Sequence, residues 1–244
     1  MDPLTTLFDE AEGDPLPLPP ELLSVYGGPL RMPRRRDRAH VFANFVATLD
    51  GIVAIDPPRG SGAEISGGHA QDRAVMGILR AAADAVIVGS GNLRAESAHV
   101  WTAETICPEL APEYGRFRAA LGKPPAPLQV IVSGSGDVDL SRPVFAGAVP
   151  AMVVTSDAGA ARLRARGARV PSVVPEGRPG WIPLAATLAA AGLGPGALVL
   201  VESGPTATTH YYAEGAVDEL FLTRSPFLVG SAAPPAPPTL GLVQ

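Results

Sequence analysis

The stretch Ala81–Arg94 (AAADAVIVGSGNLR) places the strongest constraint on how this chain folds. It reads as the end of a helix, a buried strand over Ala85–Val88 and a turn at Gly89-Ser90-Gly91. A short apolar run that is rich in β-branched residues and bounded by glycine is typical of a strand covered on both faces. The turn after such a strand lies at the carboxyl edge of a parallel sheet, where open α/β sheets bind ligands. Because glycine leaves the backbone bare, a phosphate group can approach the N–H groups of this turn.

A second stretch repeats this arrangement late in the chain. Ala197–Val201 reads as another buried strand, and it is followed by Glu202-Ser203-Gly204-Pro205-Thr206 and a helix over Ala207–Glu214. Two such turns on one sheet are able to hold a single dinucleotide between them. Neither is a Rossmann or Walker motif, since Arg94 stands where the third Rossmann glycine belongs and no Gly-Lys-Ser/Thr follows. Taken singly, each turn is more readily an ordinary structural turn.

Strands and helices alternate along the rest of the chain, which favours a mostly parallel sheet wrapped by helices. Further strands are expected at His40–Leu49, Ile52–Ile55, Leu128–Ser133, Ala151–Thr155, Arg169–Val174 and Asp218–Ser225. Further helices are expected at Glu21–Tyr26, Asp72–Ala82, Glu109–Leu121, Ala158–Arg166 and Ile182–Ala191. Pro57–Gly68 reads as a mobile loop and Glu96–Pro108 as an irregular segment. We divide the chain into an N-terminal arm (residues 1–38), one domain (39–230) and a proline-rich tail (231–244) that we expect to be poorly ordered.

Composition excludes several classes of function. A formal net charge of −5 gives no overall attraction to nucleic acid or to an anionic membrane. Cys107 is the only cysteine, so no intrachain disulfide forms, which fits a cytoplasmic protein. His99 has no second histidine or carboxylate at metal-ligand spacing, and we expect no bound metal. Together with Trp101, His99 is a candidate ligand contact, although a surface histidine is the plainer interpretation.

Four blocks of sequence occur in the order and spacing of one known family. They are Phe45–Gly51 (FVATLDG), Gln71–Val86 (QDRAVMGILRAAADAV), Val88–Glu96 (VGSGNLRAE) and Val201–Thr206 (VESGPT), the last followed by Val217–Leu220 (VDEL). As an ordered set they resemble the reductase domain of bacterial riboflavin biosynthesis over most of Ala39–Gly230. The resemblance implies the dihydrofolate-reductase-like fold, an α/β architecture in which helices flank a mostly parallel central sheet on both faces.

The resemblance also implies an activity and a set of site residues. Members of this family are homodimers that use NADPH to reduce the ribosylamino group of a pyrimidine phosphate, with the hydride delivered to the sugar C1. The implied catalytic residues are Asp50 and Glu202. The implied cofactor-binding residues are Gly89, Ser90, Gly91, Asn92, Arg94, Ser133, Ser203, Gly204, Pro205 and Thr206. The implied substrate-binding residues are Asn44, Thr48, Asp50, Arg73 and Glu202.

Ordinary chemistry agrees with several of these residue types. Arg94 is the nearest cation for the 2′-phosphate of the cofactor. A carboxylate such as Glu202 or Asp50 is able to accept hydrogen bonds from pyrimidine N–H groups, or to relay a proton. The Asp50-Gly51 pair is also a turn signal, so a purely structural role for Asp50 stays open.

The chain departs from the family at several positions. Asn92 and Ser203 stand where threonine and glycine are usual, and Asn44 stands where many members have lysine. Ser97 and Ala103 occupy the positions of an acidic residue and of an arginine that grip the substrate. The substrate itself therefore stays open. Two alternatives remain beside the leading hypothesis: a pteridine reductase of the dihydrofolate type, and a non-catalytic module that keeps only the nucleotide cleft.

Overall fold

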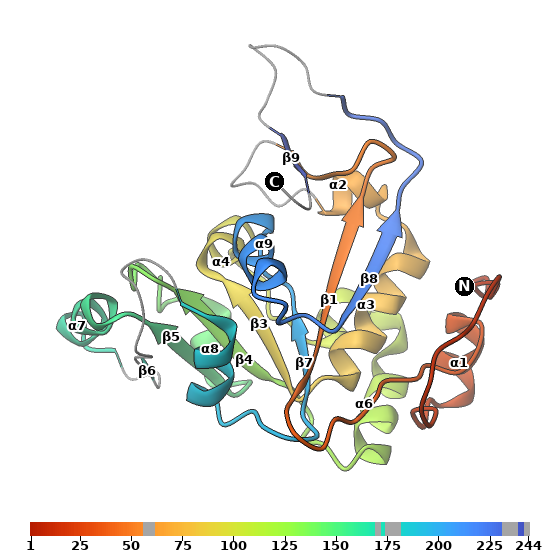
Figure 1. The fold of residues 1–244 in the computed structure, drawn as a ribbon, viewed down its shortest axis with the longest axis horizontal. Coiled ribbons are helices and arrows are strands. Elements are labelled where there is room, and N and C mark those ends of the chain that lie inside the picture. The colour runs from red at the N-terminus through yellow and green to blue at the C-terminus, as the bar shows by residue number, and fades with distance from the viewer. Residues whose placement is uncertain (56–61, 169–171, 174–181, 231–238, 242–244) are drawn as a thin grey trace.

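The main body of the protein is one parallel sheet of seven strands (Figure 1). The computed structural model describes residues 1–55, 62–168, 172–173, 182–230 and 239–241. In the order in which they lie side by side, the strands are β6 (Ser172–Val173), β5 (Ala151–Thr155), β4 (Leu128–Ser133), β3 (Ala85–Gly89), β7 (Leu198–Val201), β1 (His40–Ala47) and β8 (Glu219–Arg224). Every neighbouring pair is parallel.

The strands are apolar because both faces of the sheet are buried. In β7, Leu198 and Leu200 belong to the hydrophobic cluster on one face, whereas Val199 and Val201 belong to the cluster on the other. All four side chains are fully buried. Successive side chains of a strand point to opposite faces, so a sheet covered twice needs continuous apolar runs of this kind. The strand predicted at Ala197–Val201 is thereby confirmed.

Helices cover the two faces separately. Residues of α1 (Pro20–Tyr26), α3 (Ala70–Ala82), α6 (Ala111–Ala120) and α7 (Asp157–Ala165) pack in the first cluster. Residues of α8 (Leu184–Ala190) and α9 (Pro205–Ala213) pack in the second. This arrangement confirms the predicted fold class, a dihydrofolate-reductase-like parallel sheet with helices on both faces.

The order of the strands brings two distant segments together. From β1 the chain moves outward through β3, β4, β5 and β6, and it then returns to insert β7 between β3 and β1. Residues 202–206, which follow β7, thus lie beside residues 90–95, which follow β3, although about 110 positions separate the two segments in the sequence. Open α/β sheets bind ligands where the direction of strand addition reverses in this way.

The N-terminal segment packs through α1 against helices α3 and α6. Leu22, Leu30 and Met32 are buried in the first cluster, together with residues of α3 and α6. Arg35, which lies in a run of three arginines at residues 34–36, places its Nη2 2.9 Å from a carboxylate oxygen of Asp218.

Several local expectations are corrected. Helix α4 (Ser90–Ala95) starts directly after β3, so the predicted glycine turn is the first turn of a helix. Helix α2 (Gly62–Ser66) forms in the second half of the segment predicted to be a loop, and α5 (Ala103–Ile106) forms in the segment predicted to be irregular. The remaining elements are β2 (Ile52–Ile55), η1 (Pro108–Leu110), η2 (Pro143–Phe145) and β9 (Thr239–Gly241). Strand β9 pairs with β2, whereas the rest of the predicted tail and residues 56–61 lie outside the described residues.

Candidate active site

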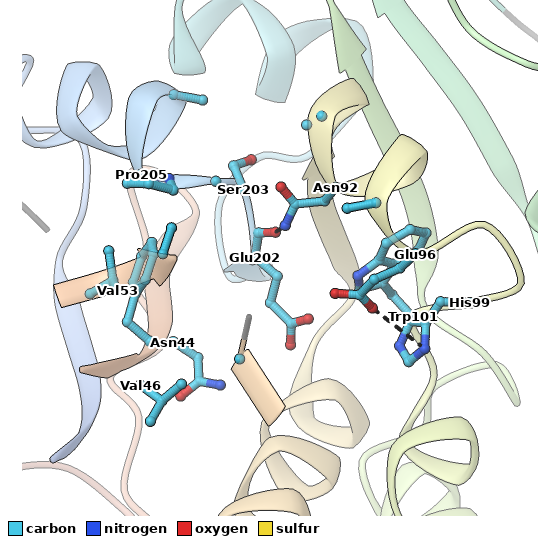
Figure 2. Close-up of a pocket in the computed structure, with 18 of the residues that line it drawn as sticks. Asn44, Val46, Val53, Asn92, Glu96, His99, Trp101, Glu202, Ser203 and Pro205 are labelled. Atoms are coloured by element: carbon cyan, nitrogen blue, oxygen red, sulfur yellow. Dashed lines mark hydrogen bonds and ion pairs between the residues drawn. The ribbon is translucent and has the colours of Figure 1, made fainter. Parts of the chain in front are cut away.

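A cavity of about 840 Å³ lies where β1, β3 and β7 end, as Figure 2 shows. Ligand sites in proteins typically have volumes of about 300–1,000 Å³. Its walls come from the end of β1, from α2 and α3, and from the segments that follow β3 and β7. The polar and charged side chains that line it include Asn44, Asp72, Arg73, Arg80, Asn92, Arg94, Glu96, His99 and Glu202.

The two glycine-containing segments lie side by side at this cavity. A Cβ atom built on Gly89 would stand 4.0 Å from the backbone nitrogen of Gly204. The amide of Asn92 donates a hydrogen bond of 3.0 Å to the backbone carbonyl of Glu202, which fastens α4 to the end of β7. A Cβ atom on Gly91 would meet nothing within 4 Å, so the space in front of this residue is open. The two segments are therefore close enough to contact one ligand.

Most of the residues predicted to bind a cofactor line the cavity. They are Gly89, Ser90, Gly91, Asn92, Arg94, Ser203, Gly204 and Pro205. Ser133 is buried beside the cavity rather than on its wall, and its hydroxyl has no hydrogen-bond partner among the described residues. Thr206 lies in the first turn of α9, and its side chain is outside the described part of the structure.

The residues predicted to bind substrate fall into two groups. Asn44, Arg73 and Glu202 line the cavity, whereas Thr48 and Asp50 do not. The carboxylate of Asp50 accepts hydrogen bonds from the Thr48 hydroxyl and from the Gly230 N–H, the latter at 2.6 Å. These bonds, led by that of Thr48, lower the pKa of Asp50. Asp50 thus ties the turn after β1 to the segment after β8, which agrees with a structural role and gives no support to a catalytic one.

Arg80 is a site residue whose role the sequence did not reveal. It is 2% exposed, and its guanidinium group holds the Glu202 carboxylate through Nε at 3.0 Å and Nη2 at 2.6 Å. Asp72, Met76 and Arg80 recur every four residues along α3 and all line the cavity. The four-residue spacing could be recognised in the sequence, because residues at this spacing share one face of a helix. The pairing of Arg80 with Glu202, 122 residues away, could not be predicted.

Three further ionisable groups surround this ion pair. Arg80 Nη1 lies 2.9 Å from His99 Nε2, and burial followed by the charge of Arg80 lowers the pKa of His99 from 6.5 to about 4. The His99 ring also packs edge-on against Trp101, with ring centres 5.1 Å apart. Burial raises the pKa of Glu96 and, separately, that of Asp72. Several ionisable groups with shifted pKa values thus line the floor of the cavity, which is typical of functional sites.

Fold and site together define the class of protein. The chain is an α/β protein of the dihydrofolate-reductase-like type, with a ligand-sized cavity at the carboxyl edge of its parallel sheet. It belongs to the RibD C-terminal domain family, whose profile matches residues 39–244. A comparison with the sequences of curated proteins gives no match.

Solved structures share this fold at low sequence identity. A pyrimidine reductase-like protein from Corynebacterium diphtheriae is 23% identical, with a TM-score of 0.60 over 85% of this chain and 82% of that one. RibD from Acinetobacter baumannii is 23% identical, with a TM-score of 0.55 over 80% of this chain and 48% of that one. The riboflavin biosynthesis reductase Rib7 from Saccharomyces cerevisiae is 15% identical, with a TM-score of 0.54 over 80% and 76% of the two chains. This chain thus spans about half of the Acinetobacter protein and most of the other two.

Proposed function

We propose that the protein is an NADPH-dependent reductase of the riboflavin-biosynthesis type. In this proposal it transfers a hydride to a ribosylaminopyrimidine phosphate or to a related heterocycle. The observation that carries the proposal is the meeting of two glycine-containing segments, at Gly89 and Gly204, on one cavity of a protein of this family. Relatives of the same fold are described as reductases of riboflavin biosynthesis or as reductase-like.

The residues present fit a dinucleotide. Gly89, Gly91 and Gly204 leave backbone without side chains on the wall, and α9 starts at Pro205 with its N-terminal N–H groups at the cavity edge. Such N–H groups suit a pyrophosphate. The Ser133 hydroxyl has no hydrogen-bond partner among the described residues and lies next to Gly134 on the wall, so it is a further candidate for contact with a bound cofactor. When bound, the cofactor supplies the hydride, while the protein supplies orientation and electrostatics.

The substrate would occupy the part of the cavity between Asn44, Arg73 and Glu202. The Glu202 carboxylate, held by Arg80, presents acceptors for heterocyclic N–H groups. Arg73 is the cation on this side, because Ala103 is buried at the start of α5 and offers no charge. Its only ion pair among the described residues, with Glu109 at 3.7 Å, is long, so its charge is available to a substrate phosphate.

A pteridine reductase of the dihydrofolate type is the second candidate. It is favoured by the three carboxyl groups of Asp72, Glu96 and Glu202 around one cavity. A pterin ring carries several N–H donors and needs carboxylate acceptors more than it needs a cation. Mixing the protein and NADPH with either 5-amino-6-(5-phosphoribosylamino)uracil or 7,8-dihydrofolate and following the absorbance of NADPH separates the two. Cofactor binding without turnover of either compound would indicate a non-catalytic module.

The cofactor assignment is tested at Arg94. Replacing Arg94 by Gln removes one charge-assisted contact with the 2′-phosphate, a loss of about 1.5–3 kcal/mol, and so weakens NADPH binding roughly 10- to 100-fold. NADH, which lacks this phosphate, should bind the wild-type protein and R94Q equally well. Fluorescence titration of tryptophan measures both affinities. Arg166→Gln, which alters an exposed arginine near Asp137, is the control. Absence of any response to millimolar NADPH or NADH would contradict the proposal.

We further propose that the protein acts as a cytoplasmic homodimer. Strand β8 is an edge of the main sheet, and its outward residues Leu220 and Leu222 are 37% and 41% exposed. Phe227 and Leu228 add exposed apolar surface just beyond the strand. Monomeric proteins rarely leave apolar groups of this kind clustered at the surface. Sedimentation equilibrium of the purified protein tests the dimer. Separately, no helix in the described ranges is long and apolar enough to cross a bilayer.

A further inference from the structure

The floor of the cavity contains a chain of contacts that begins at Arg80. Its guanidinium group donates to both oxygens of Glu202, to the Thr102 carbonyl at 3.2 Å and to His99 Nε2 at 2.9 Å. Arginine has no acceptor, so Nε2 of His99 has to accept this bond. The proton of the neutral imidazole then sits on Nδ1, which lies 3.7 Å from the Glu96 carboxylate.

This chain of contacts leaves neither Glu202 nor His99 able to give up a proton to a ligand. The Glu202 carboxylate is paired at both oxygens with a buried guanidinium group, and a carboxylate held in this way is an acceptor only. A second proton on His99 would have to enter the contact that Arg80 already fills. Burial and Arg80 accordingly lower the pKa of His99 to about 4, so its ring stays neutral near pH 7.

Glu96 differs from both. It caps the C-terminal end of α4, lines the cavity and leaves 42% of its side chain exposed. Figure 2 shows its carboxyl group beside His99 and Trp101, on the wall near Glu202. Among the described residues, its carboxylate lies 3.7 Å from Nδ1 of the neutral His99 ring and forms no ion pair.

The surroundings of Glu96 raise the pKa of its carboxyl group. The charged and titratable groups set against it are Arg80 from α3, Glu202 after β7 and His99 from the following loop. Burial raises the pKa of Glu96, the charge of Arg80 opposes the shift, and the charge of Glu202 adds to it.

Asp72 is the competing carboxyl group on the wall. Burial raises its pKa as well, but its Oδ1 accepts a hydrogen bond of 2.6 Å from the Thr223 hydroxyl, and this bond favours the ionised form. Asp72 is also only 8% exposed, so it presents less of its surface to a ligand than Glu96 does.

We propose that Glu96 is the proton donor of the reduction. This inference rests on the proposed function. In the reduction of a C=N bond, the carbon gains the hydride that the reduced dinucleotide loses, and the π electron pair moves to nitrogen. The nitrogen then takes the carboxyl proton of Glu96, and the carboxylate recovers a proton from water. One bound group provides the hydride and this side chain provides the proton, so the step is balanced in atoms and electrons.

The test replaces Glu96 by Gln, which keeps the size and polarity of the side chain and removes the acid. Loss of a general acid costs a factor of roughly 10²–10⁴ in rate. With NADPH and either of the two substrates named above, kcat of E96Q should fall by at least that lower factor, and the decline of wild-type kcat at high pH should disappear. NADPH affinity, measured by fluorescence, should stay within twofold. Glu12→Gln, on an exposed part of the N-terminal segment, is the matched control.

A second readout does not depend on turnover. Carbon-13 NMR of glutamate-labelled protein should show one carboxyl resonance that titrates above the ordinary glutamate range of about 4.3, and that is lost in E96Q but kept in E12Q. Without such a resonance the inference fails whatever the activity. An E96Q enzyme with wild-type kcat and pH profile would overturn the inference and leave the proposed function intact. The same conclusion would follow if the decline of kcat at high pH disappeared in Asp72→Asn and not in E96Q. A wild-type protein that binds no dinucleotide would overturn both.

Discussion

At the scale of single residues, the candidate site depends on side chains that satisfy one another. Arg80, buried in a helix, has its charge matched by Glu202, and the spare acceptor of His99 completes its hydrogen bonds. An unpaired buried charge would cost several kcal/mol, so these partners have to be present together. Asn92 shows the same dependence, because its amide joins α4 to the end of β7 where a smaller threonine would not reach as far.

The low pKa of His99 predicts a dependence of stability on pH. An unfolded histidine takes up a proton near pH 6.5, whereas His99 in the folded protein does so near pH 4. Between these values the unfolded state binds more protons, so the free energy of unfolding should fall by up to about 1.4 kcal/mol for each unit of decrease in pH. Urea denaturation at pH 7, 6 and 5 measures this. The slope should be reduced in His99→Gln, and an equal slope in both proteins would contradict the assignment.

At the scale of elements, helix packing on the first face is close enough to require a glycine. Gly77 of α3 stands directly against the ring of Tyr114 of α6, and the Tyr114 hydroxyl donates to the Ala74 carbonyl at 3.1 Å. The helix predicted at Asp72–Ala82 is confirmed, and its apolar residues Ile78, Leu79 and Ala82 are buried while Val75 is partly buried. The glycine contact could not be predicted, because it depends on which residue of another helix lies opposite.

Two glycine-to-alanine substitutions distinguish this contact from simple helix propensity. A methyl group on Gly77 would overlap the Tyr114 hydroxyl and ring, so Gly77→Ala should lower the free energy of unfolding by roughly 1–3 kcal/mol. Gly115 of α6 has nothing within 4 Å of the added atom, so Gly115→Ala should raise stability by up to about 1 kcal/mol. Chemical denaturation of both variants is the measurement. Equal effects would show that α3 and α6 are not packed this closely.

At the scale of the whole molecule, the hydrophobic core extends beyond the part that matches the family. The profile begins at residue 39, yet Leu22, Leu30 and Met32 are buried against α3 and α6. The sequence suggested an extended arm because prolines dominate residues 15–20. Those prolines instead lead into α1, which starts at Pro20 and packs against α3 and α6. We therefore expect the buried residues of this segment to contribute to the stability of the domain.

Two adjacent leucines test this packing. Leu22 is fully buried and Leu23 is 41% exposed. Leu22→Ala should cost about 2–5 kcal/mol of unfolding free energy, as for other buried leucines. Leu23→Ala should cost less than about 0.5 kcal/mol, as is usual at the surface. Thermal and urea unfolding of the two variants measures the difference, and a similar small effect for both would mean that the segment detaches in solution.

The fold class, the main helices and every strand except β9 could be predicted from the sequence. This is possible because strands buried on both faces, such as β3 and β7, need continuous apolar runs, and a helix packed on one side, such as α3, needs apolar residues at helical spacing. The two glycine-containing segments could also be recognised, because only glycine leaves the backbone without a side chain.

Which of the predicted residues meet could not be predicted, because it depends on the order of the strands in the sheet. The insertion of β7 between β1 and β3 brings Glu202 to Arg80, while the bonds of Asp50 to Thr48 and Gly230 keep it off the cavity wall. Local patterns cannot encode such choices. A carboxylate near a glycine has the same local sequence whether it faces a ligand or closes a turn. The distant partners, Gly230 for Asp50 and Arg80 for Glu202, are more than a hundred residues away and are brought close only by the pairing of strands.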